Sequence, residues 1–349
     1  MNAYLLLANG MVFAGQSVGA QGVTVGEVVF STGMVGFQET LTDPSYYGQI
    51  ITQTYPLIGN YGMNKDDMES DKIWAKGYIV REACQTPSNW RCEETLDSFL
   101  KKNNTIGIEG IDTRHLTRII RESGVMNGAI LTTFDPADPA NKAETEALLA
   151  EIRAYAVTDA VKNVTCAAPE VFNPEGETHI VLMHYGCKRN IVRCLVKRGC
   201  KVTVMPAFAT AEEIKALAPD GIMLSNGPGD PTENQAVIDN VRAVAELGIP
   251  IFGICLGHQL LALSQGARTE KLKYGHRGAN QPVIDLQSGR TYVTSQNHGY
   301  AVVGDSLDPS IGTVSHVNAN DHTCEGIRYH KINAFTVQFH PEAHGGPLD

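Results

Sequence analysis

The chain has 349 residues, which is enough for two domains with separate hydrophobic cores. Apolar residues make up 43% of the sequence and charged residues 19%, a balance that excludes a disordered chain. The formal net charge of −10 argues against nucleic acid as a partner, because phosphate binding needs a basic surface, and no apolar run is long enough to cross a bilayer.

The first 160 residues are predicted to form a β-rich domain with some helix. Strands are expected over residues 3–7, 23–30 and 49–54, where apolar and β-branched residues lie between Gly and Asp-Pro turns. Helices are expected over residues 96–102, 114–122 and 140–151. Asp112 and Thr113 can cap the second helix. This pattern predicts a mixed β/α domain.

The helix–strand pattern weakens over residues 161–177, which we interpret as a linker because of its Pro, Gly and Asn residues. Residues 178–349 then form the second predicted domain. The expected strands cover residues 179–183, 201–205, 221–224 and 249–254, and the expected helices cover residues 190–198, 211–217, 235–247 and 257–263. This alternation predicts an open α/β domain with a mostly parallel sheet, while residues 281–339 are richer in strands and turns.

The strongest local signal is the segment PIFGICLGHQ over residues 250–259. An apolar strand runs directly into a helix, with Cys255 at the junction and Gly253 and Gly257 two residues to either side. This is the cysteine counterpart of a nucleophile elbow, where the N-terminal end of the helix favours a thiolate. The Leu256 N–H is then placed to stabilise an oxyanion. The alternative interpretation is a buried structural cysteine.

A thiol nucleophile needs a base, and His340 is the best candidate among 11 histidines. It follows the apolar segment AFTVQF, and Pro341 and Glu342 come after it. Residues two apart on an extended chain face the same side, so His340 and Glu342 can point together into the carboxyl edge of the sheet. Glu342 would then orient the imidazole. A surface turn is the alternative, and His258 is better explained by packing on its helix.

Two polar loops are ambiguous by themselves. The segment LSNGPGDP over residues 224–231 follows a strand but matches neither nucleotide-binding glycine pattern. Its glycines can bring backbone N–H groups close to a small polar substrate, and Gly229 is a candidate second oxyanion donor. The segment QNHGY over residues 296–300 is a similar loop. Each can equally be a well-formed turn.

None of the eight cysteines forms a C-x-x-C pair, so the usual zinc and redox spacings are missing. We therefore predict no metal and interpret most of these thiols as small core residues in a reducing compartment. The N-terminus lacks a basic leader and a long apolar region, which does not fit a signal peptide. These features predict a cytoplasmic location.

Taken together, LSNGPGDP, GICLGHQ and the triplet His340-Pro341-Glu342, in this order, resemble the class I (triad) glutamine amidotransferases. The first domain narrows the resemblance to the small subunit of carbamoyl-phosphate synthetase. The segments that carry it are GEVVF (26–30), GFQE (36–39), LTDPSY (41–46), YPLIGN (55–60), IDTR (111–114), KRNI (188–191) and QNHG (296–299). The resemblance extends over essentially the whole chain.

The resemblance implies that Cys255 forms a thioester with glutamine, His340 acts as base and acid, and Glu342 orients His340. Leu256 and Gly229 would offer oxyanion N–H groups. The residues implied to hold the glutamine substrate, oxyanion donors included, are Ser45, Gly227, Gly229, Leu256, Gln259, Asn297, Gly299 and Tyr300. Ser45 would reach the site from the other domain, although a simple Pro-Ser turn explains it as well.

The resemblance also implies that the ammonia passes to a large synthetase subunit, which uses it to make carbamoyl phosphate for arginine and pyrimidine synthesis. No cofactor is expected on this chain, because nothing in it resembles an ATP site; ATP and Mg²⁺ belong to the partner. Two features depart from the family pattern. The segment AHGG follows Glu342, and we expect a final helix to be missing because the chain ends at Asp349.

Two other classes of protein remain open. One is a stand-alone cysteine hydrolase, such as a peptidase or γ-glutamyl hydrolase, which the additional N-terminal domain disfavours. The other is a non-catalytic interaction subunit with a degenerate site, which the intact Cys255, His340 and Glu342 disfavour.

Overall fold

The computed structural model describes residues 1–343 and divides the chain into two compact units, Met1–Val157 and Thr158–Asp349. The expectation of a missing final helix falls on residues 344–349, outside the described residues. Among the described residues, none of the helices is both long and apolar enough to cross a membrane.

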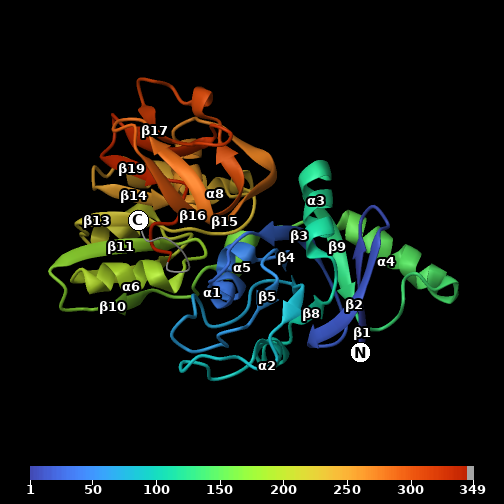
Figure 1. The fold of residues 1–349 in the computed structure, drawn as a ribbon. Coiled ribbons are helices and arrows are strands. Elements are labelled where there is room, and N and C mark those ends of the chain that lie inside the picture. Colours follow the sequence, from blue (N-terminus) through green and yellow to red (C-terminus); the bar gives the residue numbers. More distant parts are fainter. Residues whose placement is uncertain (344–349) are drawn as a thin grey trace. The chain divides into compact units, whose positions relative to one another are not determined.

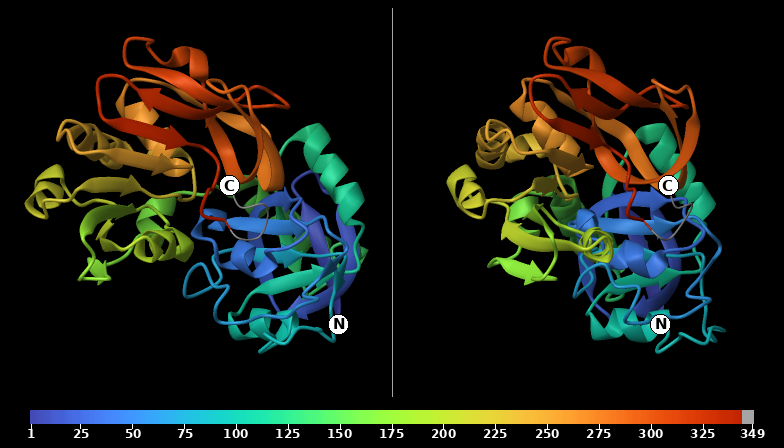
Figure 2. Two further views of the ribbon diagram at one scale, coloured as in Figure 1. Left: turned by 60° about the vertical axis from the view of Figure 1, so that its left-hand side comes forward. Right: turned by 90° about the vertical axis from the view of Figure 1, so that its left-hand side faces the viewer.

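The first unit is built around a closed β-barrel (Figure 2). Its strands follow the order β1-β2-β8-β6-β4-β3-β9. Strand β9 pairs with β1 as well as with β3, which closes the barrel and removes its edges. The barrel strands are β1 (Asn2–Leu7), β2 (Val12–Gly19), β3 (Val23–Ser31), β4 (Gln49–Gln53), β6 (Gly77–Ile79), β8 (Ile106–Glu109) and β9 (Met126–Leu131).

The helices of the first unit cover the barrel and complete two apolar cores. They are α1 (Phe37–Thr42), α2 (Leu96–Lys102), α3 (Thr113–Ser123) and α4 (Lys142–Ala154), with a small sheet of β5 (Leu57–Ile58) and β7 (Glu82–Ala83) beside them. Leu148 and Ile152 of α4 pack on Leu6 and Leu131. The predicted cap of α3 is confirmed, because the Asp112 side chain accepts a hydrogen bond from the backbone N–H of His115.

The second unit contains a ten-stranded sheet in the order β10-β12-β11-β13-β14-β19-β18-β16-β15-β17 (Figure 1). The pairs β12–β11, β11–β13, β13–β14 and β14–β19 are parallel, and the outer pairs are antiparallel. The strands are β10 (Glu170–Phe172), β11 (Thr178–His184), β12 (Cys200–Pro206), β13 (Gly221–Leu224), β14 (Ile251–Ile254), β15 (Thr269–Asp285), β16 (Thr291–Val302), β17 (Gly312–Asn318), β18 (Cys324–Tyr329) and β19 (Ala334–Val337). The predicted α/β fold with its parallel centre is confirmed.

Both faces of this parallel centre are covered by helices, as expected for buried parallel strands. Successive residues of β11 point to opposite faces of the sheet: Val181 belongs to the apolar cluster on one face and Leu182 to the cluster on the other. The first cluster contains residues of α8 and α9, and the second contains residues of α6. The helices of the unit are α5 (Ala160–Val164), α6 (Arg189–Lys197), α7 (Ala211–Ala216), α8 (Gln235–Ala245) and α9 (Leu256–Ser264).

The segment 161–177, for which the sequence predicted a linker, carries regular structure. It includes most of α5 and the whole of β10, and β10 pairs with β12 at the edge of the sheet. Phe172 packs against the cluster that contains α6. The pairing partner lies about thirty residues further along the chain, so local composition does not reveal this strand.

Candidate active site

Cys255 occupies a strained backbone position at the junction of β14 and α9. Its φ is 52° and its ψ is −103°, a conformation that L residues rarely adopt. The side chain is buried, with 2% of its residue surface exposed, and its Sγ lies 3.7 Å from the carbonyl oxygen of Asn297. Strain of this kind is typical of a nucleophile elbow, where a sharp turn turns the side chain away from the sheet.

The two glycines beside Cys255 are required by close packing. A Cβ atom at Gly257 would lie 2.3 Å from the carbonyl oxygen of Leu224, and one at Gly253 would lie 2.8 Å from Cγ2 of Thr336. Both distances are shorter than van der Waals contact. The elbow therefore holds only because these positions have no side chain.

His340 and Glu342 meet as the sequence pattern suggested. His340 Nδ1 lies 2.8 Å from Glu342 Oε1, and both side chains are buried, with exposures of 1% and 3%. The backbone N–H of His340 donates to the carbonyl oxygen of Ser295 on β16, which anchors the turn after β19. The pair is therefore not a surface turn.

A buried lysine extends this pair. Lys188 Nζ lies 2.6 Å from the same Oε1 of Glu342, with 9% of the Lys188 side chain exposed. The backbone N–H of Lys188 donates to Oδ1 of Asn226, and the Asn190 side chain donates to the carbonyl oxygen of Glu342. The carboxylate thus holds two cationic groups in an interior where an unpaired charge is costly.

The charges of this cluster shift two pKa values. Burial and Lys188 lower the pKa of His340, but Glu342 and Cys255 raise it, and the result is about 9 against an ordinary 6.5. Burial raises the pKa of Glu342, whereas Lys188 and His340 outweigh it and hold that pKa well below its usual range. An ionised Glu342 beside an imidazolium is therefore stabilised. Nε2 of His340 has no hydrogen-bond partner among the described residues, although Cys255 is close enough to affect its pKa.

These side chains come together because they follow neighbouring parallel strands. Cys255 follows β14, His340 follows β19, Lys188 follows β11, and the loop with Gly227 and Gly229 follows β13. The carboxyl ends of parallel strands share one edge of the sheet, where ligands bind in such folds.

The glycine loop approaches this edge closely. A Cβ atom at Gly227 would lie 2.3 Å from the carbonyl oxygen of Tyr185 and 2.7 Å from Cδ2 of Leu256. Gly229 has a φ of +87°, which favours glycine. Both positions thus depend on the absence of a side chain. This agrees with a loop whose backbone N–H groups can come close to a small polar substrate.

The residues predicted to hold a substrate on β16 are linked to α9. Nε2 of Gln259 donates to the carbonyl oxygen of Tyr300 at 2.7 Å and to Oε1 of Gln338 at 2.9 Å. Asn297, whose carbonyl oxygen faces Cys255, lies on β16 together with Tyr300. Gly299 lies on β16 between them. His258, the neighbour of Gln259, is fully buried with Nδ1 2.8 Å from Oγ1 of Thr336, so it is a packing residue.

Ser45 belongs to the first unit, within a short 3₁₀ turn whose Asp43 side chain accepts a hydrogen bond from the Ser45 backbone N–H. Its side chain is buried. Its contribution to the site of the second unit stays a prediction.

Two members of the cluster were not singled out from the sequence. Lys188 lies inside the segment KRNI, which carries the family resemblance, and Gln338 lies inside the apolar segment AFTVQF before His340. Both have a local signal in retrospect: Lys188 is a cation just after an apolar strand, and Gln338 is a polar residue two positions before His340.

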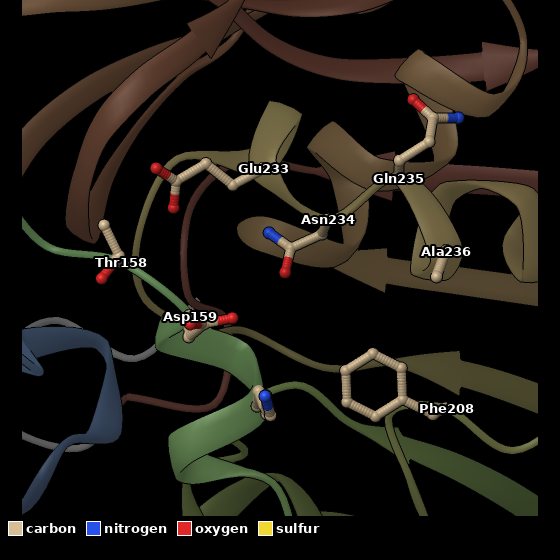
Figure 3. A pocket seen from close by; sticks show the side chains of 8 residues that line it. Thr158, Asp159, Phe208, Glu233, Asn234, Gln235 and Ala236 are labelled. Carbon is tan, nitrogen blue, oxygen red and sulfur yellow. The ribbon is translucent and has the colours of Figure 1, made fainter.

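A separate pocket of the second unit lies beside α5 and the start of α8 (Figure 3). Its volume is about 320 Å³, and its lining includes Asp159, Lys162, Phe208 and Glu233. It shares no residue with the Cys255 cluster. Burial raises the pKa of Glu233, and Asp230 and Asp159 add to this effect.

Comparison with known protein families assigns each part of the chain. Residues 5–130 match the family "Carbamoyl-phosphate synthase small chain, CPSase domain". Residues 181–349 match the family "Glutamine amidotransferase class-I". One match lies in each unit.

Curated relatives match along the whole sequence. A carbamoyl phosphate synthase small chain from Listeria monocytogenes is 51% identical over 99% of this chain and 93% of its own length. One from Bacillus caldolyticus is 50% identical over 100% of this chain and 93% of its own length. Among solved structures, a glutamine amidotransferase from Thermotoga maritima is 17% identical, with a TM-score of 0.39, over 47% of this chain and 76% of its own.

Proposed function

Because this chain belongs to the carbamoyl-phosphate synthase small-chain family and has a class-I glutamine amidotransferase domain, we propose that it hydrolyses glutamine at Cys255 and supplies the ammonia to a large synthetase chain. The observation that carries the proposal is the strained Cys255 elbow beside the buried chain His340–Glu342–Lys188. A nucleophile, a base and a group that orients the base are the parts that thiol-based acyl transfer needs.

The reaction begins from a Cys255 thiolate whose proton is held by the His340 imidazolium, and the sulfur attacks the amide carbon of glutamine. The tetrahedral intermediate carries a negative oxygen, which the backbone N–H groups of Leu256 and Gly229 stabilise. His340 returns the proton to the leaving nitrogen, and ammonia departs. A γ-glutamyl thioester remains on Cys255.

Water completes the cycle. His340 removes a proton from a water molecule, and the resulting hydroxide attacks the thioester. The carbon–sulfur bond then breaks, which releases glutamate and restores the Cys255 thiolate beside the protonated His340. Glu342 keeps the imidazole in one tautomer and stabilises the imidazolium that forms in both halves of the cycle. Lys188 holds Glu342 in place and in its ionised form, which its contact of 2.6 Å supports.

Glutamine is held by groups around the elbow. Gln259, Asn297 and Tyr300 lie on the linked elements α9 and β16, which supports a shared role. Gly227 and Gly299 let the backbone approach the substrate. Ser45 is a further proposed contact of the glutamine.

The ammonia is used by a large synthetase chain, which carries ATP and Mg²⁺ and forms carbamoyl phosphate for arginine and pyrimidine synthesis in the cytoplasm. The family relation of the first unit supports this partner, because that unit is additional to the amidotransferase domain. Cys255, His340 and Glu342 need no metal or cofactor for the chemistry described.

The test is acid quenching of the purified chain during glutamine turnover, followed by mass spectrometry of the peptide with Cys255. We expect a γ-glutamyl adduct on Cys255 and none in Cys255→Ala, with glutamate release lost in the same variant. His258→Gln is the matched control, because this buried histidine lies next to the elbow but outside the proposed chemistry. Glutamate release that survives in Cys255→Ala contradicts the proposal.

A further inference from the structure

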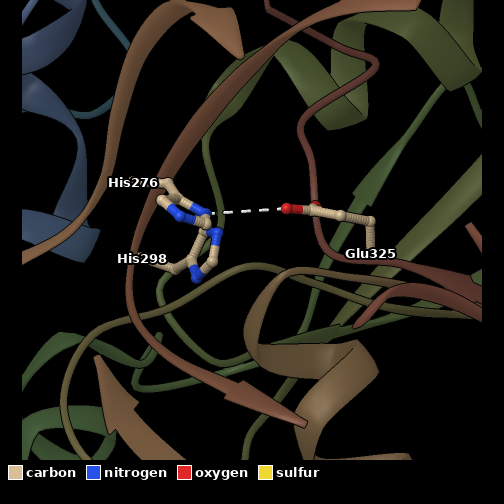
Figure 4. Close-up of side chains that lie close together, drawn as sticks. All are labelled: His276, His298 and Glu325. Atoms are coloured by element: carbon tan, nitrogen blue, oxygen red, sulfur yellow. Dashed lines mark ion pairs between the residues drawn. The ribbon is translucent and has the colours of Figure 1, made fainter. Parts of the chain in front are cut away.

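Three buried side chains from three strands converge in the antiparallel part of the second unit's sheet (Figure 4). They are His276 on β15, His298 on β16 and Glu325 on β18. One nitrogen or oxygen from each lies within 4.8 Å of the others. His276 and His298 are direct cross-strand partners, so their imidazoles share one face of the sheet. This His276–His298–Glu325 cluster lies outside the proposed glutaminase chemistry.

Each imidazole is held by its other nitrogen. Nε2 of His276 lies 2.8 Å from Oδ2 of Asp321, and Nδ1 of His298 lies 2.7 Å from the carbonyl oxygen of Tyr300. In a neutral imidazole, a carboxylate or carbonyl at one nitrogen fixes the proton there and leaves a lone pair on the other, so a metal ion at Nδ1 of His276 would take the place of a proton. Most histidines that bind metals in proteins are held in this way. Nδ1 of His276 has no hydrogen-bond partner among the described residues, whereas Nε2 of His298 lies 3.0 Å from Oε1 of Gln296, a contact that a metal ion at this nitrogen would replace.

The cluster also contains buried polar atoms without hydrogen bonds. Nδ1 of His276 and Oε2 of Glu325 have no hydrogen-bond partner among the described residues, and Glu325 is completely buried. Oε1 of Glu325 lies 3.6 Å from Nδ1 of His276, beyond hydrogen-bond distance, and receives a bond of 3.2 Å from Asn318. A divalent cation bound between this carboxylate and Nδ1 of His276 would satisfy both buried polar groups.

We propose that His276, His298 and Glu325 bind a divalent transition-metal ion, with Zn²⁺ as the expected occupant. Two imidazole nitrogens and one carboxylate oxygen form a typical ligand set for Zn²⁺. Gln296 is next to this set, with its Oε1 3.0 Å from Nε2 of His298, and can supply a further oxygen. With zinc–ligand bonds of about 2.0–2.1 Å, tetrahedral ligand atoms lie about 3.3 Å apart. Ligand atoms that are now up to 4.8 Å apart must therefore approach by up to about 1.5 Å.

The ion would connect β15, β16 and β18 at one point. His298 lies between Asn297 and Gly299, so the connection would fix the strand on which the proposed glutamine contacts lie. The role is structural, because the cluster contains no group of the Cys255 chemistry. The proposal therefore stands or falls independently of glutamine hydrolysis.

Cobalt binding tests this site with a readout that needs no glutamine. The purified full chain is stripped with a chelator and titrated with Co²⁺, whose visible absorption depends on coordination number and ligand type. We expect absorption typical of low-coordinate Co²⁺ with nitrogen and oxygen ligands, without a thiolate charge-transfer band, and loss of this absorption when Zn²⁺ is added. A thiolate band would assign the metal to cysteines and overturn the proposal.

Variants locate the ion. We expect Glu325→Gln and His276→Gln to lose Co²⁺ binding, and Asp321→Asn to weaken it about 10- to 100-fold by freeing the His276 ring. His330→Gln is the control, since this histidine is exposed, lies outside the cluster and has its side chain hydrogen-bonded to Oγ1 of Thr313. The Asp321 side chain is 44% exposed, so Asp321→Asn should fold. It therefore tests the site even if Glu325→Gln or His276→Gln does not fold. Absence of Co²⁺ binding, or binding that these variants leave unchanged, refutes the site and leaves a metal-free ion pair.

Discussion

The buried contact between Lys188 and Glu342 allows a sharp test of the charge cluster. The two charged atoms are 2.6 Å apart, and the side chains are 9% and 3% exposed. Removing one member of such a pair leaves an uncompensated buried charge, which costs about 3–5 kcal/mol. We therefore expect Glu342→Gln, which leaves Lys188 unpaired, to lower the free energy of unfolding of the second unit by this amount. Lys188→Met leaves Glu342 beside the His340 imidazolium and should lower this free energy by less.

The double variant should behave differently. Lys188→Met together with Glu342→Gln removes both charges of the pair, and the buried His340, without the carboxylate that raises its pKa, becomes neutral. Replacing a buried ion pair by uncharged groups of similar volume is often neutral or stabilising. The double variant should therefore lose less unfolding free energy than the two single variants lose together. We expect this difference to be about 3 kcal/mol or more. Activity should not return, because Glu342 no longer stabilises the His340 imidazolium.

The assay is urea unfolding followed by far-UV circular dichroism. Tryptophan fluorescence is unsuitable, because Trp74 and Trp90 both lie in the first unit. Arg242→Met is the matched control: the Arg242–Asp239 pair spans 3.0 Å but is 50% and 54% exposed, so its loss should cost less than about 1 kcal/mol. Additive losses in the double variant, or a loss in Glu342→Gln as small as that of the control, would refute the reasoning.

Three further predictions concern the same edge of the sheet. Cys255→Ser should abolish labelling by a glutamine-analogue electrophile while leaving thermal unfolding nearly unchanged; persistent labelling at other cysteines would contradict the assignment. Gly257→Ala should destabilise the second unit by about 1–3 kcal/mol, because its Cβ would lie 2.3 Å from the carbonyl oxygen of Leu224. Gly304→Ala, whose nearest atom is at 3.2 Å, should cost less in the same unfolding measurement. The pKa of His340 is raised from 6.5 to about 9, so its contribution to stability is complete below about pH 6.5 and lost as the pH rises through about 9. His340→Gln should remove this part of the pH dependence of unfolding, and an unchanged pH dependence would count against the raised pKa.

The parallel half of the second unit could be predicted from the sequence because its signals are local. Each strand and each helix there is a short segment with its own apolar pattern, and the elbow at Cys255 depends on neighbours within two positions. His340 and Glu342 also lie two residues apart, so their meeting follows from strand geometry alone.

The barrel of the first unit was not predicted, because its closure depends on pairing between distant segments. Strand β2 pairs with β8, and β9 pairs with both β1 and β3. Strand β6 has only three residues, too few for a recognisable alternation. Composition indicated a β-rich domain there, but not the register that closes it.

The lysine of the charge cluster was missed for the same reason. Lys188 and Glu342 are separated by more than 150 positions and meet only because β11 and β19 end at one edge of the sheet. No spacing rule connects them, whereas burial of both charges in the folded unit makes their pairing necessary.

Carbamoyl phosphate formation by a complex with the large synthetase chain tests the central claim most directly. It is measured for the wild type and for Cys255→Ser, each supplied with either glutamine or ammonium as the nitrogen source. We predict that Cys255→Ser loses the glutamine-dependent reaction and keeps the ammonium-dependent one, because only the release of ammonia from glutamine needs the thiol. Equal activity of the variant with both nitrogen sources would contradict the assignment of Cys255 as the nucleophile.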